Sequence, residues 1–183
     1  MIMRVSPAAN RRCLEQALGM LDRLTDHAYA RRRGDWAPVG AQFRHVLEHY
    51  QCFLDGLAGR RIDYDARPRD PCLESSRTAA RLATEAVIAR LEELEADTSD
   101  CSVLVQMQTA TTSGDPEWSA SSLARELQFL VSHTVHHFAL IKLLLADELA
   151  LDPDFGTAPS TLAHGQARHR ESSDAVSPVP MRD

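Results

Sequence analysis

Four long segments of the chain have the apolar periodicity of helices, and this pattern most constrains the fold. Apolar residues recur every three or four positions within residues 8–33, 39–57, 72–96 and 121–149, which places them on one face of a helix. Glycine and proline, which continue a helix only at a cost, interrupt the chain between several of these segments. Each helix would span roughly 30–43 Å at 1.5 Å per residue. The sequence therefore predicts an all-α fold, a four-helix bundle with one long connection before the last helix.

The apolar stripes identify the side chains that we expect to face the core. The predicted stripe of the second helix is Phe43, Val46, Tyr50, Phe53 and Leu57; that of the third is Leu82, Ala86, Ala89 and Leu94; that of the fourth is Leu123, Leu127, Leu130, Thr134, His137, Ile141 and Leu144. The fourth stripe has the three- and four-residue spacing of a bundle seam, with a histidine inside it.

The connection and the C-terminal end differ from the helices in composition. Residues 101–118 are partly β-branched and contain a turn, so we expect an irregular crossover with one short strand or extended segment. After residue 151 the periodicity is lost, and serine, proline and arginine are frequent. We therefore expect one domain over residues 1–155 and a flexible tail over residues 156–183.

Charge and hydropathy exclude several classes of function. The net charge of −6 argues against nucleic-acid binding, which needs a basic surface. No run of 18 apolar residues is present, so no transmembrane helix is predicted. The N-terminus lacks the apolar stretch of a signal peptide, and we expect a cytoplasmic protein. The four cysteines form no C-x-x-C pair and are expected to be free thiols: Cys13, Cys52, Cys72 and Cys101.

Histidine is the unusual residue of this composition, with eight in 183 residues. His45 and His49 lie in the second predicted helix, and His133 and His137 lie in the last. A spacing of four places two imidazoles on one helix face, about 5–6 Å apart at their β-carbons, where they can bind one metal ion. Burying unpaired imidazoles is costly, and a shared ion would give each of them a partner. The spacing favours a metal site; the alternative is that these are ordinary core or surface histidines.

Other motifs carry less information. The chain has no glycine-rich phosphate loop and no G-x-S-x-G nucleophile elbow. We expect Cys52 to be a small core residue and Glu126 to be a first-turn acid that suits the helix dipole. We expect the charged segment 60–71 to form a surface network of ion pairs. His164 and His169, near or in the tail, are expected to be solvated.

At the four histidines the sequence resembles the DinB/YfiT-like family of four-helix-bundle proteins. Residues 44–50 and 132–137 match the two histidine motifs of that family, and the resemblance covers about residues 8–150. It implies one divalent metal ion bound by His45, His133 and His137, with open positions for water or substrate. His49 is not required by the family pattern, and we expect it to be a fourth ligand or a proton shuttle. Many members continue with Arg-Gly-Gln after the last histidine, whereas this chain has phenylalanine at position 138, so substrate contacts are expected to differ.

The resemblance implies a metal-dependent enzyme of the thiol transferase or hydrolase type that acts on a small molecule, with a low-molecular-weight thiol as one candidate substrate. Imidazole ligands suit several divalent metals, of which we expect zinc or nickel. One alternative is a non-catalytic metal-binding or stress-response protein, in which all four histidines close the site around a structural ion. Another is a metal-free helical bundle that works as a homodimer. The resemblance also favours a homodimer for the enzyme.

Overall fold

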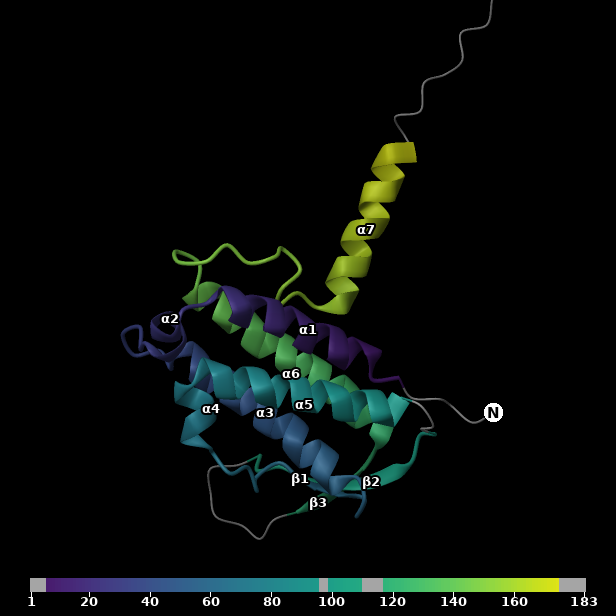
Figure 1. Ribbon diagram of the computed structural model, residues 1–183. Coiled ribbons are helices and arrows are strands. Elements are labelled where there is room, and N and C mark those ends of the chain that lie inside the picture. The colour runs from purple at the N-terminus through teal and green to yellow at the C-terminus, as the bar shows by residue number, and fades with distance from the viewer. Residues whose placement is uncertain (1–5, 96–98, 110–116, 175–183) are drawn as a thin grey trace, which may run out of the picture.

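The computed structural model describes residues 6–95, 99–109 and 117–174, which are mostly helical and include one small sheet (Figure 1). The helices are α1 (Ala8–Arg23), α2 (Asp26–Ala30), α3 (Val39–Gly56), α4 (Pro71–Ser75), α5 (Arg77–Glu95), α6 (Leu123–Leu144) and α7 (Pro159–Asp174). The strands are β1 (Arg61–Asp63), β2 (Ser102–Gln106) and β3 (Trp118–Ser122).

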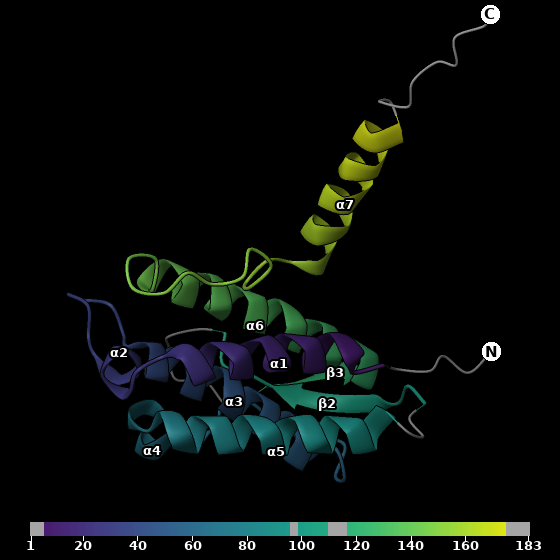
Figure 2. The same cartoon turned by 45° about the horizontal axis from the view of Figure 1, so that its top comes forward.

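Four long helices, α1, α3, α5 and α6, pack around one apolar core (Figures 1 and 2). α3 contacts both α5 and α6, and α1 contacts the same two helices. The stripe predicted for α3 is confirmed, because Phe43, Val46, Tyr50 and Phe53 are at most 1% exposed, and Leu57 packs against the core. The stripe of α6 is likewise buried or half-buried along its length. Because α3 contacts α6, the two predicted histidine pairs face each other.

Two of the predicted helices are each divided in two by a cap made by a short polar side chain. Residues 8–33 contain α1 and α2, and the hydroxyl of Thr25 begins α2 by accepting from the Ala28 N–H at 3.1 Å. Residues 72–96 correspond to α4 and α5, and the hydroxyl of Ser76 begins α5 by accepting from the Ala79 N–H at 3.2 Å. Such caps satisfy backbone donors at a helix start. Because neither glycine nor proline marks the junction between the paired helices, periodicity alone did not reveal it.

The buried face of α5 differs from the predicted one. Leu82 is 59% exposed, and Ala86 and Ala89 are also exposed. The residues of α5 that are buried in the core are Ala80, Thr84, Val87 and Leu91. Thr84 can be buried because its hydroxyl donates to the Ala80 carbonyl oxygen at 2.7 Å. The prediction was wrong for Leu82, Ala86 and Ala89, because it followed the large Leu82 instead of a stripe with small and polar members. Its fourth member, Leu94, packs against the core.

The prediction of an all-α fold is corrected by a three-stranded sheet at one end of the long helices (Figure 1). β1 pairs parallel with β2, and β2 pairs antiparallel with β3. The crossover predicted over residues 101–118 supplies β2, which matches the short strand expected there, and the first residue of β3. Its predicted turn at 113–116 lies outside the described residues. β1 is three residues long, too short for an alternating pattern to be visible. Its pairing partner, β2, lies some 40 positions away in the sequence. Local sequence patterns do not predict a pairing over that separation.

The C-terminal part of the described chain also differs from expectation. Phe155 stacks on Phe138 with ring centroids 4.7 Å apart, so the chain packs on the core up to this residue. α7 then extends away from the other helices, although its segment was predicted to have no regular structure (Figures 1 and 2). The domain boundary at residue 155 and the flexibility of residues 156–183 stay predictions. None of the helices in the described ranges has the length and apolar character that crossing a membrane requires.

Gly40 marks a close approach between α3 and α4 and gives a test of this packing. A β-carbon at this position would lie 1.9 Å from the Glu74 carbonyl oxygen and 2.7 Å from Cε1 of Tyr29. Gly40→Ala should therefore force α4 away from α3 and lower the free energy of unfolding by about 1–3 kcal/mol. Gly19→Ala is the matched control in α1, because a β-carbon there meets nothing within 4 Å. We expect it to raise stability by roughly 0.5–1 kcal/mol. Urea unfolding measures both variants, and equal stabilities would contradict the close approach.

Candidate metal centre

Helices α3 and α6 present four histidines to one another at the edge of the core. His45 and His49 lie on α3, and His133 and His137 lie on α6. Within this group, the centroids of neighbouring rings are between 4.1 and 4.9 Å apart. The structure thus brings together all four residues that the four-residue spacing selected. Their role as metal ligands stays a prediction.

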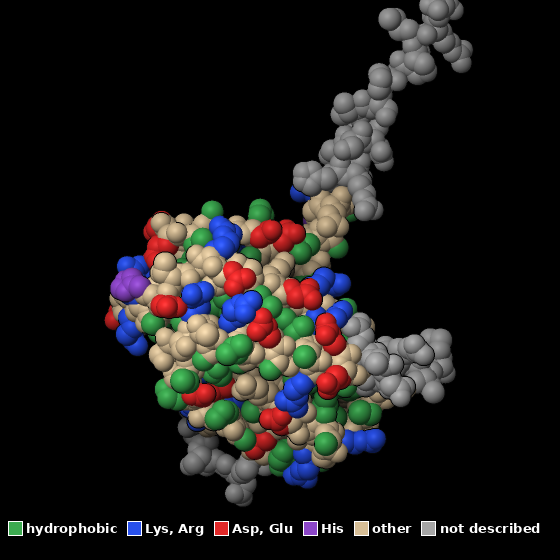
Figure 3. Space-filling model, in the orientation of Figure 1, with side chains coloured by type: hydrophobic (Ala, Val, Ile, Leu, Met, Phe, Trp, Pro, Cys, Tyr) green, Lys and Arg blue, Asp and Glu red, His purple; other side chains and the backbone are tan. Residues whose placement is uncertain are grey.

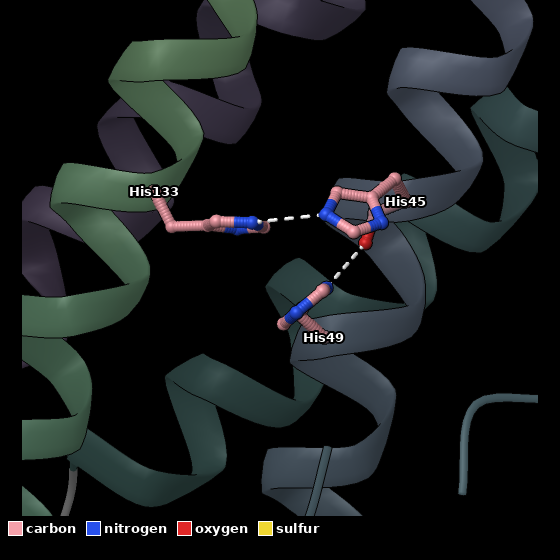
Figure 4. Close-up of side chains that lie close together, drawn as sticks. All are labelled: His45, His49 and His133. Atoms are coloured by element: carbon pink, nitrogen blue, oxygen red, sulfur yellow. Dashed lines mark hydrogen bonds between the residues drawn. The ribbon is translucent and has the colours of Figure 1, made fainter. Parts of the chain in front are cut away.

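Three of these histidines have ring nitrogens close enough to share an ion. One nitrogen each of His45, His49 and His133 lies within 4.8 Å of the other two, and Figure 4 shows the three rings converging. Nε2 of His45 and Nε2 of His133 are 3.1 Å apart. Imidazoles bind zinc at about 2.0–2.1 Å, so two nitrogens on one tetrahedral ion are roughly 3.3–3.4 Å apart. The observed separation is close to this value.

Hydrogen bonds orient two of the four rings. Nδ1 of His49 donates to the carbonyl oxygen of His45, one helical turn back, at 2.7 Å. Nδ1 of His137 donates to Oε1 of Gln42 at 2.6 Å. A neutral imidazole has only one N–H, so both rings keep a lone pair on Nε2. Partners of this kind are what orient metal-binding histidines in proteins.

Arg67, in the loop between β1 and α4, determines where the hydrogens of the other two rings lie. Its Nη1 donates to Nδ1 of His45 at 2.5 Å. Because arginine can only donate, Nδ1 of His45 carries the lone pair and Nε2 carries the hydrogen. That hydrogen faces Nε2 of His133, which leaves the N–H of His133 on Nδ1. This atom is buried and has no hydrogen-bond partner within the described chain.

Burial lowers the pKa of all four imidazoles and keeps them neutral near pH 7. Desolvation is the largest cause for each ring, and the positive charge of Arg67 acts in the same direction on all four. The pKa falls to about 3 for His45, to about 2 for His133, and to about 4 for both His49 and His137. The neutral form is the one that binds metal ions, so the donor set fits an ion held by imidazoles.

Aromatic rings cover one side of the histidines. Tyr64 stacks on His49 with centroids 5.4 Å apart, and Phe129 stacks on His133 with centroids 5.5 Å apart. The hydroxyl of Tyr64 donates to Oε2 of the buried Glu126 at 2.9 Å. Glu126 lies in the first turn of α6, as predicted. It also fixes the position of an aromatic ring against the site.

Other residues considered in the sequence lie elsewhere or lack the expected chemistry. His136 and His164 are exposed, and the side chain of His169 lies outside the described residues. Cys52 packs against the core, and burial raises the pKa of its thiol to about 11, which disfavours a thiolate nucleophile. Phe138 is buried in the core, so this position does not provide the substrate contact that the family pattern would place there.

Sequence reasoning missed three residues that contact the histidines, namely Gln42, Tyr64 and Arg67. Gln42 precedes His45 by three positions, and this spacing on one helix face was the available signal. Tyr64 and Arg67 belong to segment 60–71, which was predicted to be a surface network of ion pairs. That prediction is wrong, because the described ion pairs include none between two residues of this segment.

A hollow of about 490 Å³ lies on the opposite face of α6 and does not involve the histidines. Its walls come from the starts of α1 and α7 and from the outer side of α6, including Gln128, Val131 and Val135. These positions are about half a helical turn away from His133. The candidate site is therefore defined by the geometry of the histidines and not by this hollow.

Comparisons with known proteins give one family match and one partial relative. A family model described as the DinB superfamily matches residues 9–141. The chain is also 30% identical over 104 residues to a protein named FK506-binding protein 5 from Rhizopus delemar. That match covers 56% of the chain and 27% of the relative, so the chain spans about a quarter of this relative's length. No solved structure matches the chain significantly.

The family match and the geometry agree at the histidines. The matched residues 9–141 make up more than half of the chain and include both histidine pairs, on α3 and on α6. The chain belongs to the DinB superfamily.

Proposed function

We propose that this DinB protein is a metal-dependent enzyme, a thiol transferase or hydrolase that acts on a small molecule at an ion held by histidines. The observation that carries the proposal is the convergence of neutral imidazole nitrogens from His45, His49 and His133 within 4.8 Å. The unsatisfied Nδ1 of His133 also supports it, because an ion would reorganise the bonding of this cluster. A bound divalent ion, for which we propose zinc or nickel, lowers the pKa of a water or thiol that it holds.

The surrounding residues would bind and orient the ligands. Gln42 and the His45 carbonyl hold His137 and His49 with a lone pair on Nε2. Tyr64 and Phe129 shield one side of the cluster from water. Excluding water strengthens the electrostatic interactions within such a site.

A non-catalytic role is the second candidate, and the position of His137 favours it. The ring centroid of His137 is 4.6 Å from the centroids of both His45 and His133. If all four histidines bind the ion, the site is closed, as in structural metal sites. If three bind it, a position remains for water or substrate. The number of histidine ligands therefore separates the two candidates.

The remaining parts of the proposal follow from resemblance and composition. The four long helices form a DinB-type four-helix bundle. The protein is cytoplasmic, and the family resemblance favours a homodimer. The net charge of −6 supports a small-molecule substrate over nucleic acid.

The metal site is tested by substitution of His133. The wild-type chain should bind one divalent ion. Loss of a residue that only orients a metal ligand costs roughly 10–100-fold in metal affinity. His133→Gln should cost more than this, because it removes a ligand. His136→Gln is the matched control, since this neighbouring side chain is exposed, and it should bind like wild type. Elemental analysis gives the metal content, and competition with a chromogenic chelator gives the affinity.

Unchanged affinity in His133→Gln would contradict the site. Two assays of the metal-loaded protein test the proposed catalytic activity. The first measures the consumption of small thiols by a panel of electrophiles, and the second measures the hydrolysis of small esters. We expect metal-dependent activity in one of these assays that His133→Gln abolishes. A metal-loaded protein that is inactive in both assays would favour the structural ion.

The role of His137 is tested together with its partner Gln42. We expect His137→Ala to lose most of the metal affinity. We expect Gln42→Leu to weaken binding about 10–100-fold, because the His137 ring loses the acceptor that orients it. Chelator competition measures both variants. Wild-type affinity in both would show instead that His45, His49 and His133 form the ligand set.

The buried imidazoles should make the metal-free protein less stable in mild acid. An unfolded histidine has a pKa near 6.5, whereas burial lowers the pKa of His45 to about 3 and that of His49 to about 4. Below pH 6.5 the unfolded chain therefore binds more protons than the folded chain, and the free energy of unfolding falls as the pH falls. We expect a lower melting temperature at pH 5 than at pH 7, by roughly 2–4 °C for each kcal/mol lost.

Calorimetry of variants assigns this pH dependence to the cluster. The double variant His45→Gln/His133→Gln should flatten the change between the two pH values. His27→Gln, which removes an exposed histidine, should leave it as in wild type. A wild-type melting temperature that is the same at pH 7 and pH 5 would show that the imidazoles are not held neutral by burial.

A further inference from the structure

The loop between β1 and α4 is fixed on both sides of Arg67. At its start, Oδ1 of Asp63 accepts from the Asp65 N–H at 2.9 Å. At its end, Oε1 of the buried Glu48 accepts from the Asp70 N–H at 2.7 Å. Both acids thus bind loop backbone. The loop is anchored to β1 and to α3, so the position of Arg67 beside the histidines is a property of the fold.

The charge of Arg67 has no acidic partner in the part of the chain that the structure describes. By contrast, the half-buried Arg44 forms an ion pair with Glu74 at 2.5 Å. Arg67 instead contacts two imidazoles, with Nη1 at 2.5 Å from Nδ1 of His45 and at 3.5 Å from Nδ1 of His49. Its Nε is buried and makes no hydrogen bond within the described ranges. A guanidinium in this state has unused donor capacity, and it lies beside the site.

The contact between Arg67 and His45 is incompatible with an ion on His45. If His45 binds the ion through Nδ1, Nη1 of Arg67 occupies the place of the ion. If it binds through Nε2, the hydrogen of the neutral ring moves to Nδ1, which then faces a donor of Arg67 instead of accepting from it. In both cases Arg67 has to turn away from His45. An anion bound at the same place would then offset its positive charge next to a divalent ion.

We propose that Arg67 is the anion-binding residue of this site and that its ligand is the carboxylate of a small molecule bound beside the ion. This inference rests on the proposed function, because it requires the histidines to hold an ion. The planar fork of a guanidinium matches the two oxygens of a carboxylate. Arg67 contacts His45 in the ion-free protein and the carboxylate in the loaded protein. Ion binding and carboxylate binding therefore favour each other, as linkage requires.

Arg67→Gln separates this role from structural support, since it should change two affinities in opposite directions. In carboxylate-free buffer, metal affinity measured by chelator competition should rise about tenfold, because a competing positive charge is removed. Acetate is the probe for the anion, titrated into cobalt-loaded protein at constant ionic strength and followed by visible absorption. Its affinity should fall about tenfold or more, because a charge-assisted hydrogen bond is lost. Arg69→Gln makes the same charge change at an exposed position of the same loop, and it should alter neither affinity.

Arg67→Lys is the second variant, which keeps the charge without the planar fork. It should bind metal like wild type and bind acetate more weakly, and it provides the test if Arg67→Gln does not fold. Two results would overturn this inference without contradicting the metal site. One is weaker metal binding in Arg67→Gln, and the other is an unchanged acetate affinity in the Arg67 variants. A wild-type protein that takes up no ion would overturn the proposed function, and this inference with it.

Discussion

The packing of neutral imidazoles between α3 and α6 is the constraint on which the rest of the structure depends. Each buried ring nitrogen needs a hydrogen-bond partner or an ion. Within the protein, the His45 carbonyl, Gln42 and Arg67 each provide a partner for one ring. These partners come from α3 itself and from the loop after β1. The histidine cluster therefore requires both the contact between the two helices and the placement of that loop.

The relative position of α3 and α6 is set beside the cluster by a polar contact within the core. Nδ2 of Asn10, on α1, donates to the Tyr50 hydroxyl and to the Leu127 carbonyl oxygen, both at 3.1 Å. Oγ1 of Thr134 lies 3.2 Å from the same hydroxyl. Tyr50 and Thr134 directly follow His49 and His133 in the sequence. Because a buried polar group is costly to leave unpaired, these contacts favour one register of the two helices, the one in which the histidine rings meet.

The sequence predicted the parts of the fold and site that depend on local periodicity. The α3 stripe and the meeting of the two histidine pairs follow from spacings of three and four, which a helix converts directly into a common face. The breaks at Thr25 and Ser76 depend on hydrogen bonds between side chain and backbone, and the face of α5 depends on how small side chains pack. The sheet and the position of Arg67 depend on pairing between segments far apart in the chain. No periodicity within either segment encodes such a pairing.

The small sheet, which the sequence did not predict, positions the charged side of the candidate site. The N–H of Tyr64 donates to the Gln106 carbonyl oxygen at 3.0 Å, which extends the pairing of β1 and β2 by one residue. Tyr64 in turn stacks on His49, and Arg67 follows three residues later. The site thus has a helical side, which carries neutral imidazoles, and a loop side, which carries a positive charge. Loops tolerate more sequence change than the helices that they connect. In this chain the helices carry the histidine pairs, while the loop after β1 carries Arg67, the residue that we propose binds an anionic ligand.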